Sequence, residues 1–124
     1  MLEQASFTNE AITIAGKEFK AVPGCVPAAM PWKDLDVEGI FESTGAFNSL
    51  EEGSKHLDAG AKKMAITAPG CNCPTYAAGV KEGEYDPESD VVVSKASGTT
   101  AGMASVRNVL DESFGVECGL FAAV

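Results

Sequence analysis

The sequence predicts an α/β fold built on a mostly parallel sheet. Short apolar runs typical of strands alternate along the chain with two segments that carry helix start and stop signals. The run Val91–Val93 is apolar on both faces, as in a parallel strand that is covered on both sides. The chain has 124 residues, which is the size of one small domain, so we expect residues 1–124 to form a single unit.

The first expected element is a β-hairpin. Apolar residues alternate with polar ones at Ile12 and Ile14 and again at Phe19 and Ala21, on either side of the turn Ala15-Gly16-Lys17. Prolines at positions 23, 27 and 31 then interrupt regular structure. We therefore expect the hairpin to be followed by an irregular crossing, and then by a strand over residues 36–43.

A capping box predicts the first helix. Ser49 and Glu52 have the spacing of that motif, so the helix is expected to run from Leu50 to near Ala59 and to stop at Gly60. Three strands are expected next, over residues 63–67, 76–80 and 91–93.

A second helix is expected to begin at Thr99 or Thr100 and to reach about Phe114, where Gly115 closes it. Its apolar residues recur at helical spacing on one face, which comprises Met103, Val106, Val109 and Leu110. A last strand is expected over residues 116–124.

The charge balance excludes several classes of partner. Asp and Glu number 18 against nine Lys and Arg, for a net charge of −9. Such a chain lacks the cations that neutralise nucleic-acid phosphates or an anionic membrane surface. No apolar run has the length of a membrane span, and the first residues lack a signal-peptide pattern, so we expect an intracellular protein. The acidic residues, Glu38 and Glu42 among them, form no obvious catalytic pair and are interpreted as solvated.

Four cysteines, Cys25, Cys71, Cys73 and Cys118, are too irregularly spaced for a disulfide scaffold. The Cys71-x-Cys73 pair could be half of a metal site, which would need two more ligands from Cys25, Cys118 or His56. We expect instead an inert reduced pair and no metal.

Several motifs together resemble the phosphorylating glyceraldehyde-3-phosphate dehydrogenases. The run Ser94–Ala101 is similar to the family's Ser-Asn-Ala-Ser-Cys-Thr-Thr-Asn, whose Cys is the nucleophile, and Gly98 stands at the position of that Cys. The other segments with this resemblance, in the family's order and spacing, are Pro31-Trp32, Phe41–Phe47, His56–Pro69, Gly79-Val80 and Tyr85-Asp86-Pro87.

The resemblance implies a partial Rossmann-like fold, the second half of the dehydrogenase's NAD-binding domain. It implies that Thr44, Gly45, Thr67 and Ala68 match the nicotinamide side of the cofactor groove, and that Ser97, Thr99 and Thr100 match a phosphate site. The family's Gly-rich dinucleotide loop and catalytic His have no counterpart in this sequence. We therefore expect these sites to be vestigial, with no bound NAD.

A glycine at position 98 supplies no thiolate, so the resemblance predicts a pseudoenzyme. The favoured interpretation is a structural or accessory subunit of a larger protein assembly, with an organelle (plastid or mitochondrion) as its setting by analogy. One alternative is a fragment of an active or split dehydrogenase. Another is a regulator that binds a dehydrogenase.

Overall fold

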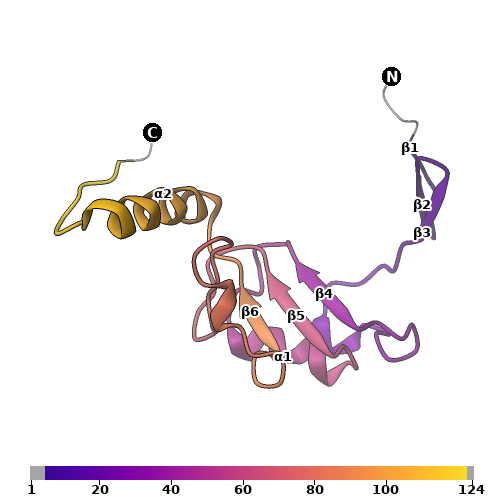
Figure 1. Ribbon diagram of the computed structural model, residues 1–124. Helices are drawn as coiled ribbons and strands as arrows, with labels where there is room; N and C mark the ends of the chain where they lie inside the picture. The colour runs from indigo at the N-terminus through magenta and orange to yellow at the C-terminus, as the bar shows by residue number, and fades with distance from the viewer. Residues whose placement is uncertain (1–4, 123–124) are drawn as a thin grey trace.

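The computed structural model describes residues 5–122, which form two separate three-stranded sheets. Strands β1 (Ala5–Phe7), β2 (Ala11–Ile14) and β3 (Lys17–Lys20) make an antiparallel sheet, and β4 (Gly39–Glu42), β5 (Lys63–Ile66) and β6 (Val92–Ser94) make a parallel one. Figure 1 places the antiparallel sheet and helix α2 (Gly98–Phe114) on opposite flanks of the parallel sheet. The predicted α/β class, with an N-terminal hairpin and a parallel sheet, is confirmed.

The hairpin contains a strand that the sequence pattern did not indicate. β1 adds to the predicted β2–β3 pair, and Phe7, Ile12 and Phe19 stand opposite one another across the three strands. Residues in register share a face of the sheet, so this row forms one apolar face. All three side chains are exposed, and that of Phe7 is 85% exposed.

The backbone of Ala15 in the hairpin turn is strained, and a substitution could relieve that strain. Ala15 and Gly16 both have positive φ, 51° and 77°, which is the geometry of a type I′ turn. Alanine tolerates this region poorly, whereas asparagine tolerates it well. Ala15→Asn is therefore expected to stabilise the hairpin by about 0.5–1 kcal/mol, seen as slower amide exchange in β2 and β3. Ala15→Val is the control and should speed exchange, and unchanged exchange in the Asn variant would contradict this reading of the turn.

Helix α1 (Leu50–Asp58) begins as the capping box predicts. The Glu52 amide donates to Ser49 Oγ at 3.2 Å. In turn, Glu52 Oε2 accepts from the Asn48 amide at 3.1 Å. The helix packs on one face of the parallel sheet, where Met64, Ile66 and Val92 form the core. It approaches closely at Gly53, where a Cβ would lie 3.0 Å from both Met64 Sδ and Val92 Cγ1.

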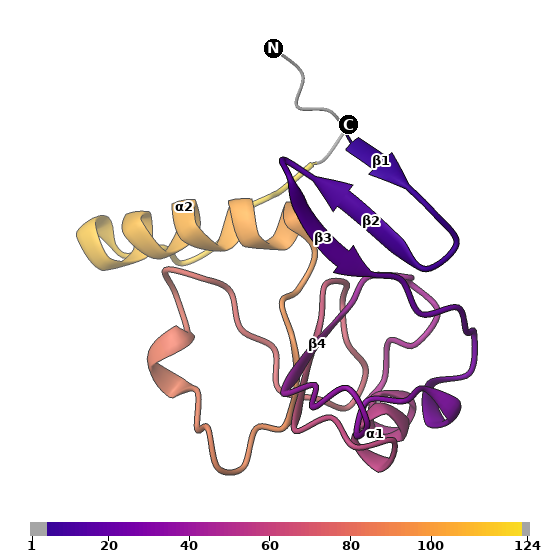
Figure 2. The same ribbon diagram turned by 90° about the vertical axis from the view of Figure 1, so that its right-hand side faces the viewer.

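The opposite face of the parallel sheet is apolar and open. Phe41, Ala65 and Val93 lie in register on that face, and the Phe41 side chain is 79% exposed. Parallel sheets are normally covered on both faces, so an exposed aromatic residue here is unusual. Figure 2 shows this sheet from its β4 side, with α1 on the lower right.

Two strand predictions are wrong. Residues 76–80 form a turn, in which the amides of Val80 and Lys81 both donate to the Ala77 carbonyl and Gly79 has φ +78°. Pairing with β6 is limited to one bridge between Thr75 and Ser94, in which the Tyr76 amide donates to the Ser94 carbonyl at 2.9 Å. Residues 116–122 form no strand but run back beside α2 (Figures 1 and 2), and positions 123–124 of the expected strand lie outside the described residues.

Helix α2 starts at Gly98, slightly earlier than predicted, with Ser97 as its N-cap. Gly115 ends it with φ +70°, as expected. None of its residues is buried by the described part of the chain, and the predicted apolar stripe is exposed, Val106 and Val109 by more than 60% each. Within residues 5–122, no helix combines the length and hydropathy that crossing a bilayer requires.

Candidate functional site

The loops that follow β4, β5 and β6 meet at the carboxyl edge of the parallel sheet. Thr44 and Gly45 follow β4, Thr67 and Ala68 follow β5, and Ser97 lies after β6 at the start of α2. The carboxyl ends of parallel strands form the usual ligand-binding crevice of such sheets. This edge is therefore the candidate site, and it brings together all the residues matched to the cofactor groove.

The polar groups of Thr44 are engaged within the protein. Its backbone amide donates to Glu42 Oε1 at 2.6 Å, and its hydroxyl donates to the same oxygen. Gly45 forms the next turn with φ +76°, and its carbonyl accepts from the Asn48 side chain at 2.7 Å. Thr44 thus holds Glu42 in place, while Gly45 supplies a backbone turn.

Thr67 and Ala68 are likewise held by neighbouring strands. The Thr67 hydroxyl donates to the Glu42 carbonyl at 3.1 Å, and its amide donates to the same carbonyl at 2.9 Å. The Ala68 carbonyl accepts from Ser94 Oγ at 2.8 Å. Both residues tie the ends of the strands together across the sheet.

Glu42 is buried, so its interpretation as a solvated residue is wrong. It is 4% exposed, because β4 turns this side chain toward α1, where His56 is 6% exposed. Trp32 Nε1 donates to His56 Nδ1 at 2.9 Å, so the neutral imidazole carries its hydrogen on Nε2. That Nε2 lies 3.5 Å from Glu42 Oε2 and has no hydrogen-bond partner among the described residues. The alternation of β4, with Ile40 and Glu42 on one face, was the signal that could have found this cluster.

The hydroxyls at the start of α2 are paired with each other. Ser97 Oγ accepts from the Thr100 amide at 3.0 Å and lies 2.7 Å from Thr100 Oγ1. Thr99 is exposed beside them. The arrangement is that of a capped helix, in which two of the three predicted anion ligands, Ser97 and Thr100, bond to each other.

Gly98 occupies open space in the first turn of α2. A Cβ built on it would meet no heavy atom within 4 Å, and its φ is not positive. Neither the packing nor the backbone conformation therefore requires glycine at this position.

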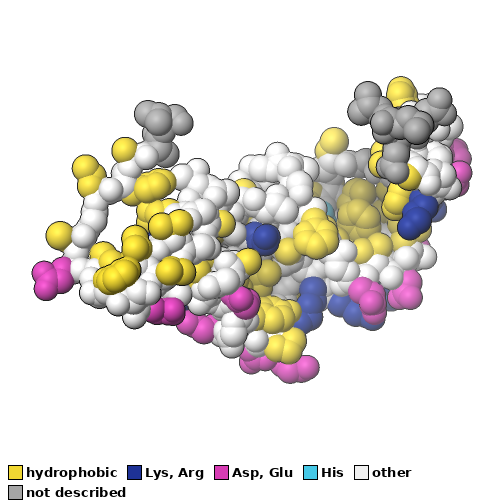
Figure 3. Space-filling model, turned by 45° about the horizontal axis from the view of Figure 1, so that its top comes forward, with side chains coloured by type: hydrophobic (Ala, Val, Ile, Leu, Met, Phe, Trp, Pro, Cys, Tyr) yellow, Lys and Arg dark blue, Asp and Glu magenta, His cyan; other side chains and the backbone are white. Residues whose placement is uncertain are grey.

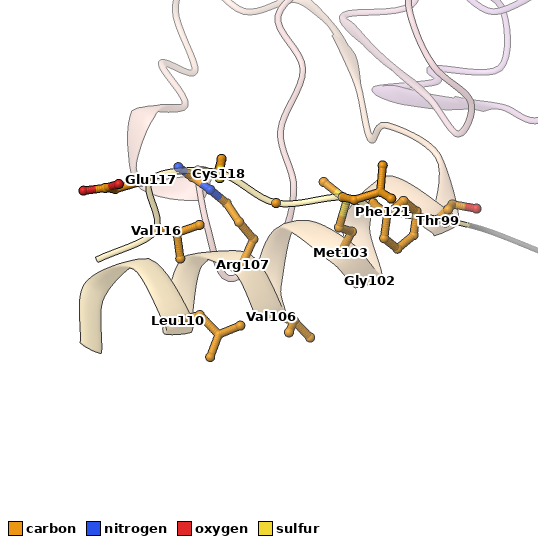
Figure 4. Close-up of a pocket in the computed structure, with 13 residues that line it drawn as sticks. Thr99, Gly102, Met103, Val106, Arg107, Leu110, Val116, Glu117, Cys118 and Phe121 are labelled. Carbon is orange, nitrogen blue, oxygen red and sulfur yellow. The ribbon is translucent and has the colours of Figure 1, made fainter. Parts of the chain in front are cut away.

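A groove of about 980 Å³ runs between α2 and the C-terminal segment (Figure 4). Gly98 and Thr99 lie at the first turn of α2, and Cys118 lines the same groove from the other side. In Figure 4 Cys118 lies near Arg107, in the middle of the helix, whereas Thr99 lies at its start. Most of the remaining lining is apolar, including Met103 and Phe121.

No metal site is formed in residues 5–122, where no three His, Cys, Asp or Glu side chains gather closely enough to hold an ion. All four cysteines are free. His56 lies within the Trp32 and Glu42 cluster.

A separate polar cluster fixes the loop before β6. Tyr76 donates its hydroxyl to Asp90 Oδ2 at 2.6 Å, and this hydrogen bond, with desolvation, raises the pKa of Tyr76 to about 12. The same bond lowers the pKa of Asp90. Lys63 Nζ donates to Tyr85 Oη at 2.8 Å, which holds the retained Tyr85-Asp86-Pro87 segment against β5. These side chains fix the conformation of the loop, while the Tyr76 amide donates to the Ser94 carbonyl at 2.9 Å, at the carboxyl end of β6.

Comparison with known proteins identifies relatives over nearly the whole chain, although no family model matches it. The chain is 39% identical over 122 residues to "Glyceraldehyde-3-phosphate dehydrogenase" of Chlamydia muridarum (strain MoPn / Nigg), which covers 98% of this chain and 36% of that protein. It is 40% identical over 117 residues to "Glyceraldehyde-3-phosphate dehydrogenase 2" of Bacillus subtilis (strain 168). This match covers 94% of this chain and 34% of that protein. "Glyceraldehyde-3-phosphate dehydrogenase B, chloroplastic" of Pisum sativum is 43% identical over 113 residues. This match covers 90% of this chain and 25% of that protein. The chain spans about a third or less of these relatives' length.

Proposed function

The chain is a homologue of one segment of the glyceraldehyde-3-phosphate dehydrogenase family, and from that premise we propose that it is a non-catalytic, structural or accessory subunit of a larger protein assembly. The observation that carries the proposal is Gly98 at the position of the family's nucleophilic Cys. Without a side chain, this residue forms no thiohemiacetal and no acyl-enzyme.

The surroundings of Gly98 support the proposal that the nucleophile was lost. They do not support the alternative, that the fold requires a glycine at this position. Because a Cβ would fit there without a contact, a Cys could occupy the position in this fold. Glycine in a helix instead costs about 1 kcal/mol relative to alanine. The residue therefore offers the fold no packing advantage that would offset the missing thiol.

The role as a subunit is supported by three uncovered apolar faces. They are the hairpin row Phe7, Ile12 and Phe19, the open face of the parallel sheet at Phe41, and the stripe of α2. Figure 3 shows hydrophobic side chains gathered at the α2 end of the molecule and over its centre. Exposed apolar patches of this kind are typical of surfaces that another polypeptide covers. The proposed partner is protein, and the organellar setting stays a prediction.

The proposal includes no bound NAD. Thr44 and Thr67, matched to the cofactor groove, direct their hydroxyls to Glu42 rather than away from the protein. In our proposal these residues are kept because they end β4 and β5 and join the two strands.

An activity assay tests the proposal. A tagged particle that carries this chain, purified under mild conditions, is expected to form no NADH from glyceraldehyde-3-phosphate, phosphate and NAD, because position 98 has no thiol. Gly98→Ala is the matched control, and it should leave the background rate unchanged. Substrate-dependent NADH formation that disappears when this chain is depleted would overturn the proposal.

One observation favours a second candidate, a split dehydrogenase. Cys118 lines the same groove as Gly98 and is the one thiol that does so among the described residues. In that case Cys118 would have to supply the nucleophile, and Cys118→Ser would abolish turnover while Cys25→Ser would not. Equal rates in the two variants reject this candidate.

A further inference from the structure

The Cys71-Asn72-Cys73 segment forms a bend that is anchored at both ends. Asn72 has φ +56°, so the chain turns between the two cysteines. The Cys71 amide donates to the Asn48 carbonyl at 2.7 Å and its carbonyl accepts from the Leu50 amide at 3.0 Å. On the other side, the Pro74 carbonyl accepts from the Ser94 amide at 2.8 Å. A turn at Asn72 brings the cysteine Cα atoms closer than an extended strand would, toward the separation that a disulfide spans.

The two thiols differ in accessibility. Cys71 is exposed, whereas Cys73 is half-buried and packs against the Met64, Ile66 and Val92 core. Cys73 Sγ lies over Gly70, where a Cβ would collide with it. Burial, and then the charge of the Cys71 thiolate, raise the pKa of the Cys73 thiol.

We propose that Cys71 and Cys73 form a reversible redox site that closes to an intrachain disulfide by exchange with a small-molecule disulfide of the glutathione class. The site goes beyond the proposed function, because it uses neither Gly98 nor the apolar faces. The exposed Cys71 is the attacking thiol, and the half-buried Cys73 is the resolving one.

The chemistry balances in two exchange steps. The Cys71 thiolate attacks one sulfur of the small disulfide, so that a mixed disulfide forms and one small thiolate leaves. Cys73 loses its proton to solvent and attacks Cys71 Sγ, so that the Cys71–Cys73 bond forms and the second small thiolate leaves. The two protons lost by the cysteines protonate the two released thiolates. Two electrons pass from the protein dithiol to the small disulfide.

The surroundings favour this exchange over metal binding. A tetrahedral zinc site needs four ligands, and residues 5–122 offer no third His, Cys, Asp or Glu near the pair. A dithiol without further ligands can still close on itself. The anchored bend keeps the two partners together in the reduced protein.

The test uses the full chain with Cys25→Ser and Cys118→Ser, so that only the pair remains. After treatment with glutathione disulfide at neutral pH, intact mass spectrometry is expected to find the loss of two hydrogens, about 2 Da, and no retained glutathione. The matched control adds Cys73→Ser, which should trap one glutathione on Cys71. Adding Cys71→Ser instead should slow the reaction about tenfold, because the remaining thiol is half-buried and less ionised.

Peptide mapping of the unsubstituted chain keeps the test independent of any folding defect in the variants. After the same treatment it should find Cys71 linked to Cys73. Retention of two glutathiones by the two-cysteine chain, no reaction at either residue, or disulfides only between chains would each overturn the proposal.

Discussion

Replacing Ile66 with alanine is expected to destabilise the parallel sheet by about 3–4 kcal/mol. Ile66 is fully buried on the central strand β5, at the centre of the core with Met64 and Val92. The substitution removes buried methylene and methyl groups and leaves a cavity beneath α1. A core of so few buried side chains has little capacity to refill that space, so a large part of the stability is lost.

The measurement is urea unfolding followed by circular dichroism, with Ile14→Ala as the control. Ile14 is 46% exposed on the hairpin, so the same truncation there should cost less than about 1 kcal/mol. Similar losses in the two variants would contradict a core centred on β5.

Ser94→Ala is the second large effect, expected at about 2–4 kcal/mol, because Ser94 is a fully buried hydrogen-bonding hub. Its Oγ accepts from the Gly70 amide at 3.0 Å and from the Ala96 amide at 3.1 Å, and it donates to the Ala68 carbonyl at 2.8 Å. Alanine would leave these backbone groups without a partner inside the protein. The loop after β5 and the turn into α2 should therefore loosen together.

Hydrogen exchange measures this directly at the Gly70 and Ala96 amides, which should lose protection in Ser94→Ala. Ser43→Ala is the matched control, since Ser43 is exposed and its Oγ has one side-chain neighbour, Thr67 Oγ1 at 3.3 Å, whose proton is shared with the Glu42 carbonyl. It should change stability by less than about 0.5 kcal/mol. Retained protection at both amides in Ser94→Ala would mean that other groups satisfy them.

The elements that the sequence predicted well are those whose signals are local. Helix α1 follows its capping box between Ser49 and Glu52, and α2 ends at Gly115 as expected. The segments at residues 76–80 and 116–122 had the apolar composition of strands, but composition alone does not place a segment against a sheet. The chain meets the outer edge of β6 at a single bridge at Thr75 and then leaves it in the turn at the Ala77 carbonyl, while residues 116–122 run beside α2.

The sequence pointed to the site residues only through the family resemblance, and it did not give their contacts. The structure places Thr44, Thr67 and Ser97 after consecutive parallel strands, at one edge of the sheet. The burial of Glu42 depends on His56 and Thr44, and only the folded chain brings His56 to it. The apolar stripe of α2 was correctly located, but its exposure could not be predicted, because it depends on which other elements pack against the helix.

The most direct test of the proposed accessory role is the size of the native particle that carries this chain. Sedimentation of a gentle extract, with peptides of this chain detected by mass spectrometry, is expected to find it with other proteins in a particle far larger than the chain alone. The neighbours in that fraction identify the partners that cover the hairpin and α2 faces. Sedimentation of the chain alone, as a monomer at its own mass, would contradict the account.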